Sequence, residues 1–317
     1  MVTPLRVVYF GTPQFAVPTL EALLQSRHTV CGVVTQPDRP RGRGQHVTPS
    51  PVKALAQERG LPIQQPDRLR EAEVADTLRR WAPDLGVVAA YGKIIPESLL
   101  QLPRLGMINV HASLLPRYRG AAPVHRAVIA GDPETGVTIM RVVKALDAGA
   151  MIATATRPIG PDETSDLVER DLSRLGAALL VDVVDRLASG PVEEVPQDDS
   201  QSTYAARLTK EEGLLDWTLP AAILHNRVRG LYPWPHAYTF IEGRRLIVRR
   251  SHALAGGAAE PGTVVAAGAD GFDVATGEGV LRVTEVQPEG RRPMLAREFL
   301  AGHRLEVGTR FTGPAPS

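Results

Sequence analysis

Asn109 and His111 are the residues whose types and spacing best fit a catalytic role. They stand at the end of an apolar run, Met107–Val110, that predicts a buried strand. Because side chains alternate across a strand, residues two positions apart point to the same side. An Asn and a His placed together there can donate hydrogen bonds to an oxygen that gains negative charge during a reaction.

A carboxylate, Asp147, follows within the segment Lys144–Gly149, between two predicted strands. In such a loop it can orient an imidazole or accept a proton from a nucleophilic amine. Taken singly, an Asn-x-His pair at a strand end and an Asp before Ala-Gly are both common in ordinary turns. The sequence therefore leaves open whether Asp147 meets His111.

The elements that must position these residues alternate between apolar strands and helices. The predicted strands are Leu5–Phe10, Thr29–Val34, Leu85–Ala90, Met107–Val110, Val137–Val142 and Met151–Thr156, and helical spacing occurs within 16–24, 71–81 and 176–187. This alternation predicts an α/β domain over residues 1–189 with a Rossmann-like, mostly parallel sheet. Ligands of such sheets bind beyond the carboxyl ends of the strands, which is where Asn109 and His111 fall.

The pattern changes after Ser189. Residues 190–208 are polar and predict a linker. Short alternating runs follow at 237–241, 245–251, 262–266, 271–275 and 280–286, separated by glycine-containing turns. Their regular spacing predicts a second domain over residues 209–317, a small antiparallel β-barrel of the OB-like type.

Composition excludes several classes of protein. The net charge is +1, from 36 basic and 35 acidic residues, which excludes a bulk polycation but not a local basic patch. One cysteine, Cys31, forms no internal disulfide. No secretory signal and no apolar run of about 18 residues is visible, so we expect a cytoplasmic chain without a membrane partner.

Motif spacing excludes further classes. Only Gly11 stands where a dinucleotide-binding turn needs three glycines, which disfavours an NAD oxidoreductase. There is no phosphate-binding G-x-x-x-x-G-K-[ST] loop, and the eight histidines are scattered, so we expect no metal site.

The run Asn109–Gly120, NVHASLLPRYRG, resembles the signature of folate-dependent formyltransferases. Further similar runs are Phe10–Ala16, Thr35–Pro40, Ala90–Pro96, Gly131–Met140, Leu146–Gly149, Lys210–Gly213 and Tyr232–Pro235. The resemblance therefore extends over nearly the whole chain.

This resemblance implies 10-formyltetrahydrofolate as formyl donor and the amino group of methionyl initiator tRNA as acceptor, with a monomeric enzyme. It implies that Asn109, His111 and Asp147 carry catalysis. It also assigns folate binding to Ser113, Leu114, Leu115, Pro116, Val88, Tyr91 and Gly92.

The segment 35–53 holds four basic residues against one acidic residue and lacks helical or strand periodicity. A loop of that length in a compact domain is usually functional, and arginines suit contacts with RNA phosphates. By resemblance this loop engages the tRNA acceptor stem. The implied tRNA-binding residues are Arg39, Arg41, Arg43, Arg207 and Lys210.

Other functions stay open at this stage. A glycinamide ribonucleotide formyltransferase, a sugar-nucleotide amine formyltransferase and a formyltetrahydrofolate hydrolase share the Asn-His-Asp core. None of them explains the basic loop together with the whole second half. An RNA-binding module on an inactive formyltransferase fold is disfavoured, since all three catalytic residue types are present.

Overall fold

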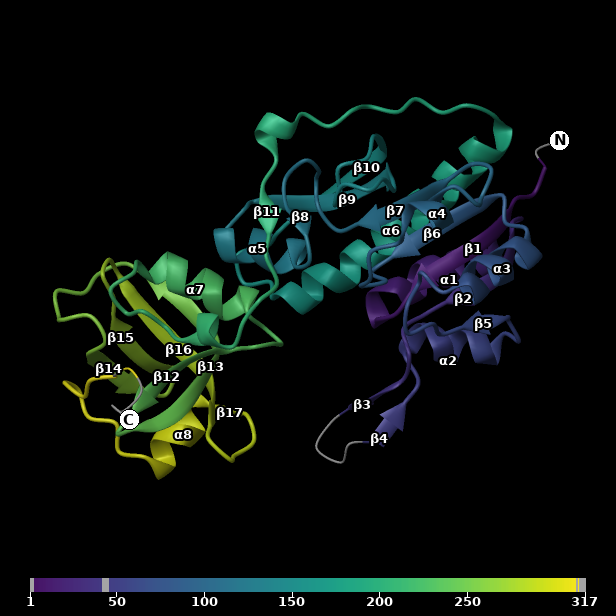
Figure 1. The fold of residues 1–317 in the computed structure, drawn as a ribbon. Helices are drawn as coiled ribbons and strands as arrows, with labels where there is room; N and C mark the ends of the chain where they lie inside the picture. The colour runs from purple at the N-terminus through teal and green to yellow at the C-terminus, as the bar shows by residue number, and fades with distance from the viewer. Residues whose placement is uncertain (1–2, 42–45, 312, 314–317) are drawn as a thin grey trace. The chain divides into compact units, whose positions relative to one another are not determined.

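The computed structural model describes residues 3–41, 46–311 and 313. These residues form two compact units (Figure 1). The first comprises Met1–Pro123, Glu134–Arg157 and Glu169–Ala205, and the second comprises Val124–Pro133, Pro158–Val168 and Ala206–Ser317.

A seven-stranded sheet forms the centre of the first unit, in the order β10-β9-β7-β6-β1-β2-β5. Its strands are β1 (Arg6–Gly11), β2 (Thr29–Val34), β5 (Ile63–Gln64), β6 (Leu85–Ala89), β7 (Met107–His111), β9 (Glu134–Arg141) and β10 (Met151–Pro158). The five strands from β5 to β7 are parallel, and β9 runs antiparallel to β7. The predicted mostly parallel sheet is confirmed.

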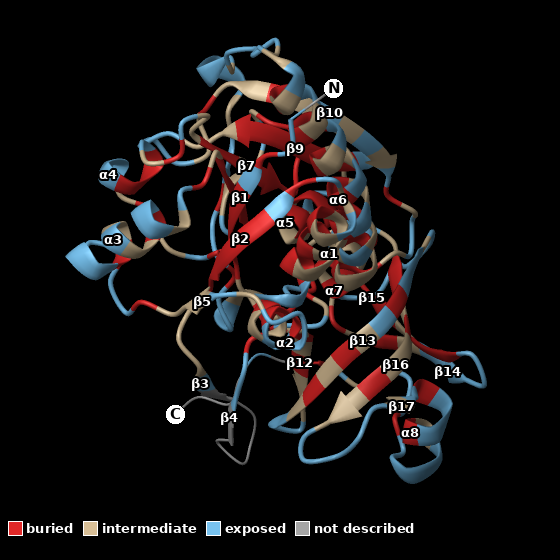
Figure 2. Cartoon of the chain, turned by 90° about the vertical axis from the view of Figure 1, so that its right-hand side faces the viewer, coloured by how far each residue is buried: buried red, intermediate tan, exposed pale blue. Residues whose placement is uncertain are grey.

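The two faces of this sheet are covered by different helices. Alternation along β1 places Val8 and Phe10 in one apolar cluster with Val74 of α3 (Ala72–Trp81) and Leu99 of α4 (Glu97–Leu100). On the other face the Tyr9 hydroxyl donates to the Ala16 carbonyl, just before α1 (Val17–Gln25). The inner strands are buried along their length, whereas the edge strand β10 alternates (Figure 2).

The long helix α6 (Ser165–Ser189) packs on the same face as α1. A Cβ at Gly176 would lie 2.9 Å from a methyl carbon of Val110 and 3.3 Å from one of Val137. This close approach explains why a glycine stands within an otherwise good helical sequence. Helix α6 therefore packs against the face of β7 opposite the one that carries Asn109 and His111.

The segment 35–53 has more regular structure than its sequence predicts. β3 (Arg39–Arg41) and β4 (His46–Thr48) pair antiparallel, and α2 (Pro51–Glu58) begins within the segment. The expectation of no strand or helix was wrong because three-residue strands are too short to show a period. The helix start carried a local signal: Ser50 caps it by accepting from the Lys53 amide, and Pro51 occupies its first position.

The stretch that the sequence predicts as a linker is packed against the first unit over much of its length. Val195 bridges to Met151, and β11 (Tyr204–Ala205) pairs in parallel with β8 (Arg119–Gly120). A short 3-10 helix, η2 (Asp199–Gln201), lies between them. The segment around β8, which follows β7 in the sequence, is thus paired with residues that are distant in the chain.

The second unit holds an antiparallel sheet of six strands in the order β12-β13-β16-β15-β14, with β17 also paired to β16. The strands are β12 (Ala237–Ile241), β13 (Arg244–Leu254), β14 (Val264–Gly268), β15 (Gly271–Ala275), β16 (Val280–Pro288) and β17 (Met294–Leu295). This unit also holds α7 (Ala221–Gly230) and α8 (Ala296–Gly302), the residues of α5 (Pro123–Ala130) from Val124 onward, and the first residues of α6, up to Val168. The predicted antiparallel second domain is confirmed.

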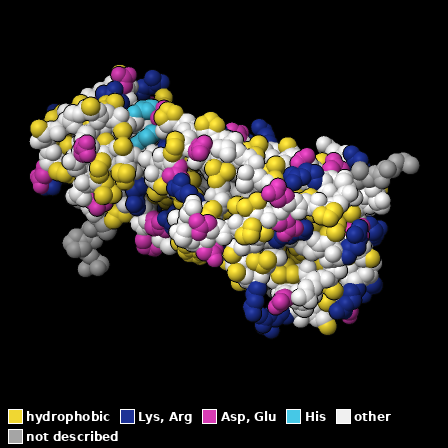
Figure 3. Space-filling view, turned by 90° about the horizontal axis from the view of Figure 1, so that it is seen from above, with side chains coloured by type: hydrophobic (Ala, Val, Ile, Leu, Met, Phe, Trp, Pro, Cys, Tyr) yellow, Lys and Arg dark blue, Asp and Glu magenta, His cyan; other side chains and the backbone are white. Residues whose placement is uncertain are grey.

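Among the described residues, no helix combines the length and apolar composition needed to cross a membrane. Basic and acidic side chains are interspersed on the face seen in Figure 3, in keeping with the small net charge.

Candidate active site

Asn109 and His111 lie on one face of β7, near its carboxyl end. The ladder places Asn109 beside Val88 of β6 and Met140 of β9, and it places His111 beside Thr138. The predicted common orientation of Asn109 and His111 thus follows from the strand that carries them.

The imidazole of His111 is held between a carbonyl and a carboxylate. Its Nε2 lies 2.9 Å from the Tyr118 carbonyl oxygen, and its Nδ1 lies 3.8 Å from Oδ2 of Asp147. A carbonyl oxygen only accepts, so Nε2 carries the proton and Nδ1 faces the carboxylate. The 3.8 Å gap is longer than a hydrogen bond, which leaves both groups able to bind a substrate atom.

Asp147 comes from the loop between β9 and β10, which folds back along the sheet to reach the end of β7. Its backbone is left-handed, with φ of 48°, a conformation that costs energy for any residue except glycine. Its Oδ2 accepts from the Gly120 amide at 2.8 Å. The carboxylate is therefore aimed by the segment that follows β7.

The loop after β7 is tied down by side chains of its neighbours. Thr138 donates to the Ser113 carbonyl at 2.7 Å and accepts from the Leu115 amide at 3.2 Å. The Ser113 hydroxyl donates to the Arg117 carbonyl at 2.7 Å. Of the four residues in this loop that were assigned to folate, Ser113 and Leu115 are buried, while Leu114 and Pro116 are partly exposed.

The end of β6 and the loop after it offer backbone rather than side chains. Val88 and Tyr91 are 9% and 1% exposed, and both side chains pack into the apolar cluster with Phe10. The Tyr91 hydroxyl has no hydrogen-bond partner among the described residues, and burial raises its pKa to about 12. A folate contact by Val88 or Tyr91 must therefore use main-chain atoms, next to the exposed Gly92 with φ of 82°.

Loops after three parallel strands are joined at the same edge of the sheet. The Tyr91 carbonyl accepts from Gln36 Nε2 at 2.7 Å and from Thr12 Oγ1 at 3.2 Å. A cavity of about 340 Å³ lies beside them and is also lined by Arg39 and Ser50. This cavity opens at the carboxyl ends of β1 and β2, where ligands of such sheets bind.

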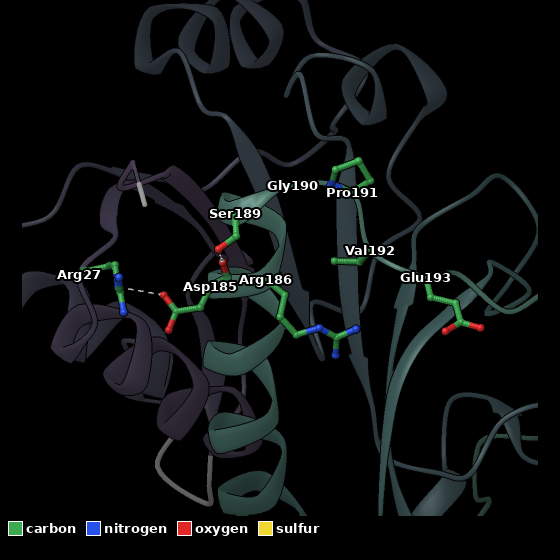
Figure 4. A pocket seen from close by; sticks show the side chains of 8 residues that line it. All are labelled: Arg27, Asp185, Arg186, Ser189, Gly190, Pro191, Val192 and Glu193. Atoms are coloured by element: carbon green, nitrogen blue, oxygen red, sulfur yellow. Dashed lines mark hydrogen bonds and ion pairs between the residues drawn. The ribbon is translucent and has the colours of Figure 1, made fainter. Parts of the chain in front are cut away.

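A larger cavity of about 520 Å³ is not the candidate site. It is lined by Arg27, Asp185, Arg186 and residues 189–193 (Figure 4). Arg27 lies just before β2, at the amino ends of the parallel strands, and it pairs with Asp185 at 3.0 Å. The catalytic candidates stand at the opposite edge of the sheet.

The residues assigned to tRNA fall in both units. Arg39 is exposed in β3, and Arg207 and Lys210 are exposed in the second unit. Of Arg41 only the backbone is described, in β3, and Arg43 lies outside the described residues. Among the described residues, no group of three His, Cys, Asp or Glu side chains is arranged to hold a metal ion.

Sequence reasoning missed three contributors to the site. Tyr118 and Gly120 stand within the quoted motif, but only the fold shows that their main-chain atoms hold His111 and Asp147. Gln197 donates to the Asp147 carbonyl at 2.8 Å, and nothing in its polar surroundings marks it in the sequence.

Two family models match the chain. The model of formyl transferases matches residues 5–184, and the model of the formyl transferase C-terminal domain matches residues 207–304. The parallel-sheet unit with Asn109, His111 and Asp147 lies largely within the first match. The class of protein is therefore a formyl transferase with both domains.

A curated relative narrows this class. The methionyl-tRNA formyltransferase of Geobacter sulfurreducens is 49% identical over 307 residues, covering 97% of this chain and 96% of the relative. The chain belongs to the methionyl-tRNA formyltransferase family.

Solved structures share the fold at low identity. The N-formyltransferase from Helicobacter canadensis, in complex with folinic acid and dTDP-3-aminofucose, has a TM-score of 0.67 at 15% identity, with 88% of this chain and 99% of that one covered. HypX from Aquifex aeolicus in complex with tetrahydrofolic acid has a TM-score of 0.63 at 14% identity, with 97% of this chain covered. This chain spans about half (51%) of HypX.

Proposed function

We propose that this protein transfers the formyl group of 10-formyltetrahydrofolate to the amino group of methionyl initiator tRNA. The observation that carries the proposal is the set formed by Asn109, His111 and Asp147 at the carboxyl edge of the sheet, in a chain of this family. The products are N-formylmethionyl-tRNA and tetrahydrofolate.

The reaction begins when the neutral amine attacks the formyl carbon. A C–N bond forms, and the formyl oxygen gains negative charge in a tetrahedral intermediate. Asn109 donates a hydrogen bond to this oxygen, and protonated His111 donates a second one through Nδ1, because its Nε2 is already bonded to the Tyr118 carbonyl. Both bonds stabilise the charge in the transition state. Asn109 is the one residue of β7 that is partly exposed, which is consistent with access of substrate to it.

Asp147 accepts the proton that the attacking amine loses, directly or through a water molecule. The intermediate then collapses, the bond between the formyl carbon and N10 breaks, and N10 takes up a proton as tetrahydrofolate leaves. Asp147 also lies beside the imidazole of His111. Its negative charge there stabilises the protonated His111 that donates to the oxyanion.

The folate binds along Ser113, Leu114, Leu115 and Pro116, with the main chain of Val88, Tyr91 and Gly92 as the second wall. Backbone groups of the loop after β6 read the polar edge of the pterin, and apolar side chains of the loop after β7 contact its ring. The hydrogen bonds of Thr138 to the second loop keep this surface rigid.

We assign residues 1–189 to the catalytic domain and residues 209–317 to a domain that binds tRNA, joined by residues 190–208. Arg39, Arg41, Arg43, Arg207 and Lys210 contact the tRNA backbone. The enzyme acts as a monomer in the cytoplasm, and its sedimentation coefficient alone and with tRNA tests the monomeric state.

The direct test offers one labelled formyl donor to several acceptors in parallel. Methionyl initiator tRNA, methionyl elongator tRNA, glycinamide ribonucleotide and an amino-sugar nucleotide are each incubated with 10-formyltetrahydrofolate and the enzyme. Transfer to the initiator tRNA alone is the expected result. Transfer to a small amine alone would keep the Asn-His-Asp chemistry and reject the tRNA acceptor.

A further inference from the structure

Gln197 is the only residue between 193 and 201 that is not exposed. It lies in the polar stretch between α6 and β11, where the neighbouring residues are exposed. Its amide points inward and forms hydrogen bonds with the loop that carries Asp147 and with Arg119 of β8. Such an inward polar side chain in an exposed segment needs a specific reason.

Every strong hydrogen-bonding position of this amide is used. Its Nε2 donates to the carbonyl oxygens of Asp147 and Gly149, both at 2.8 Å. Its Oε1 accepts from Nε and Nη2 of Arg119, at 2.9 and 2.8 Å. Because carbonyls only accept and a guanidinium only donates, the orientation of the amide is fixed by its partners.

These bonds hold the backbone of Asp147 and of the residues that follow it. Asp147 has the left-handed φ of 48°, which a non-glycine residue holds only when its surroundings impose it. Gln197 donates hydrogen bonds to the carbonyl of Asp147 and to the carbonyl of Gly149. Through Arg119 it is also joined to the segment whose Gly120 amide binds the carboxylate at 2.8 Å.

We propose that Gln197 is a positioning residue for Asp147: it holds the left-handed turn that aims the carboxylate at the reaction centre. This inference rests on the proposed function for the role of Asp147. Gln197 itself reaches substrate at no step. Its effect is to reduce the motion of the loop 142–150, so that the proton acceptor is in place when the amine attacks.

The test uses two variants of the full-length enzyme. Gln197→Met keeps the length of the side chain but removes its hydrogen bonds. Gln197→Glu keeps the acceptors for Arg119 but places a carboxylate against two carbonyl oxygens. Both should lower kcat by about 10- to 100-fold, while the KM values for folate and tRNA change by less than about twofold.

Asp199→Asn is the matched control. Asp199 also binds Arg119, at 2.7 Å, but its side chain is 81% exposed and makes no contact with the loop. This variant should keep the wild-type kcat. Equal kcat losses in Asp199→Asn and Gln197→Met would overturn the proposal, because they would point to Arg119 rather than to the loop.

Hydrogen exchange provides a readout that does not depend on the substrate. In both Gln197 variants the amides of residues 144–149 should exchange faster, with unchanged exchange in β1 and β6. If kcat and loop exchange both stay at wild-type values, the proposal is wrong. Failure of the wild-type enzyme to formylate methionyl initiator tRNA would instead reject the proposed function, and the exchange result would still decide the role of Gln197.

Discussion

The Nδ1 atom of His111 faces Oδ2 of Asp147 across 3.8 Å, although 35 residues separate them in the chain, counted from 112 to 146. Neither group relies on the other for its position. The ring is held by the Tyr118 carbonyl through Nε2, and the carboxylate is held by the Gly120 amide. The two catalytic candidates are therefore preorganised from the same short loop.

Asp147→Asn should abolish most of the turnover without harming the fold. The amide retains an oxygen that can accept from Gly120, but it cannot take a proton from the amine. We expect kcat to fall by about 10²- to 10⁴-fold. Formyl transfer under saturating substrates measures the effect, and an unchanged kcat would exclude Asp147 as the proton acceptor.

His111→Ala and Asn109→Ala should each lower kcat by about 10²- to 10³-fold, as expected for the loss of one hydrogen-bond donor to the oxyanion. The KM for the folate should change little, because these donors act in the transition state. The double variant should lose less than the product of the single losses if the two act on the same oxygen. A larger KM with normal kcat would assign the residues to ground-state binding instead.

Tyr91→Phe should stabilise the protein. The buried hydroxyl has no partner among the described residues, so its removal relieves a desolvation cost of about 1 kcal/mol. Urea denaturation should show a higher free energy of unfolding. The KM for the folate should stay constant, because we propose that Tyr91 contacts the folate only through main-chain atoms. A raised KM would show that the hydroxyl itself contacts substrate.

His236 should make the stability fall with acidification. Burial and the guanidinium groups of Arg249 and Arg245 lower the pKa of this imidazole from 6.5 to about 4. Its stabilising contribution is present above pH 6.5 and is lost as the pH falls from there toward 4, since the unfolded chain takes up the proton first.

The matched variant for this test is His236→Asn. Asn tolerates the left-handed φ of 67° and carries no titratable group. The Tm of the wild type should drop more steeply than the Tm of the variant between pH 7 and pH 5. Parallel curves would show that His236 does not contribute.

Arg43→Ala and Arg41→Ala should weaken tRNA binding without affecting chemistry. Each lost phosphate contact raises the KM for tRNA and lowers the slope of log KM against log salt by about 1. Arg79→Ala is the control, because Arg79 forms an exposed ion pair with Asp76 and has no assigned role. Salt slopes equal to the wild type would reject the assignment of this loop to tRNA.

Strands could be predicted where an apolar run ends at turn residues on both sides. The bounds Thr29–Val34, Ala237–Ile241 and Gly271–Ala275 agree with the structure for this reason. The reversed direction of β9 could not be predicted, because parallel and antiparallel strands share the same alternation. No helix was predicted over α7, whose apolar face consists of Ala221, Leu224 and Val228 and is too short to show a clear period.

The types of the candidate catalytic residues could be read from the sequence, but the contacts between them could not. Asp147 meets His111 only because its loop turns back along the sheet, which depends on the tertiary structure. For Val88 and Tyr91 the position could be predicted, but the side-chain environment could not. Their positions near the end of β6 and in the loop after it were predicted, while the burial of their side chains depends on the packing of α3 and α4.

The pairing of β8 with β11 has a consequence for the order in which the protein becomes active. Gly120, whose amide binds the carboxylate of Asp147, is paired with Ala205 in this ladder, and the Ala205 carbonyl accepts from the Ala121 amide at 2.9 Å. The amide of Tyr118 donates to the Thr203 hydroxyl at 2.8 Å. A growing chain that has reached only the end of α6 contains all three catalytic candidates but lacks the residues that form these contacts. We therefore expect the site to be completed only after the residues up to 205 have been synthesised and have left the ribosome.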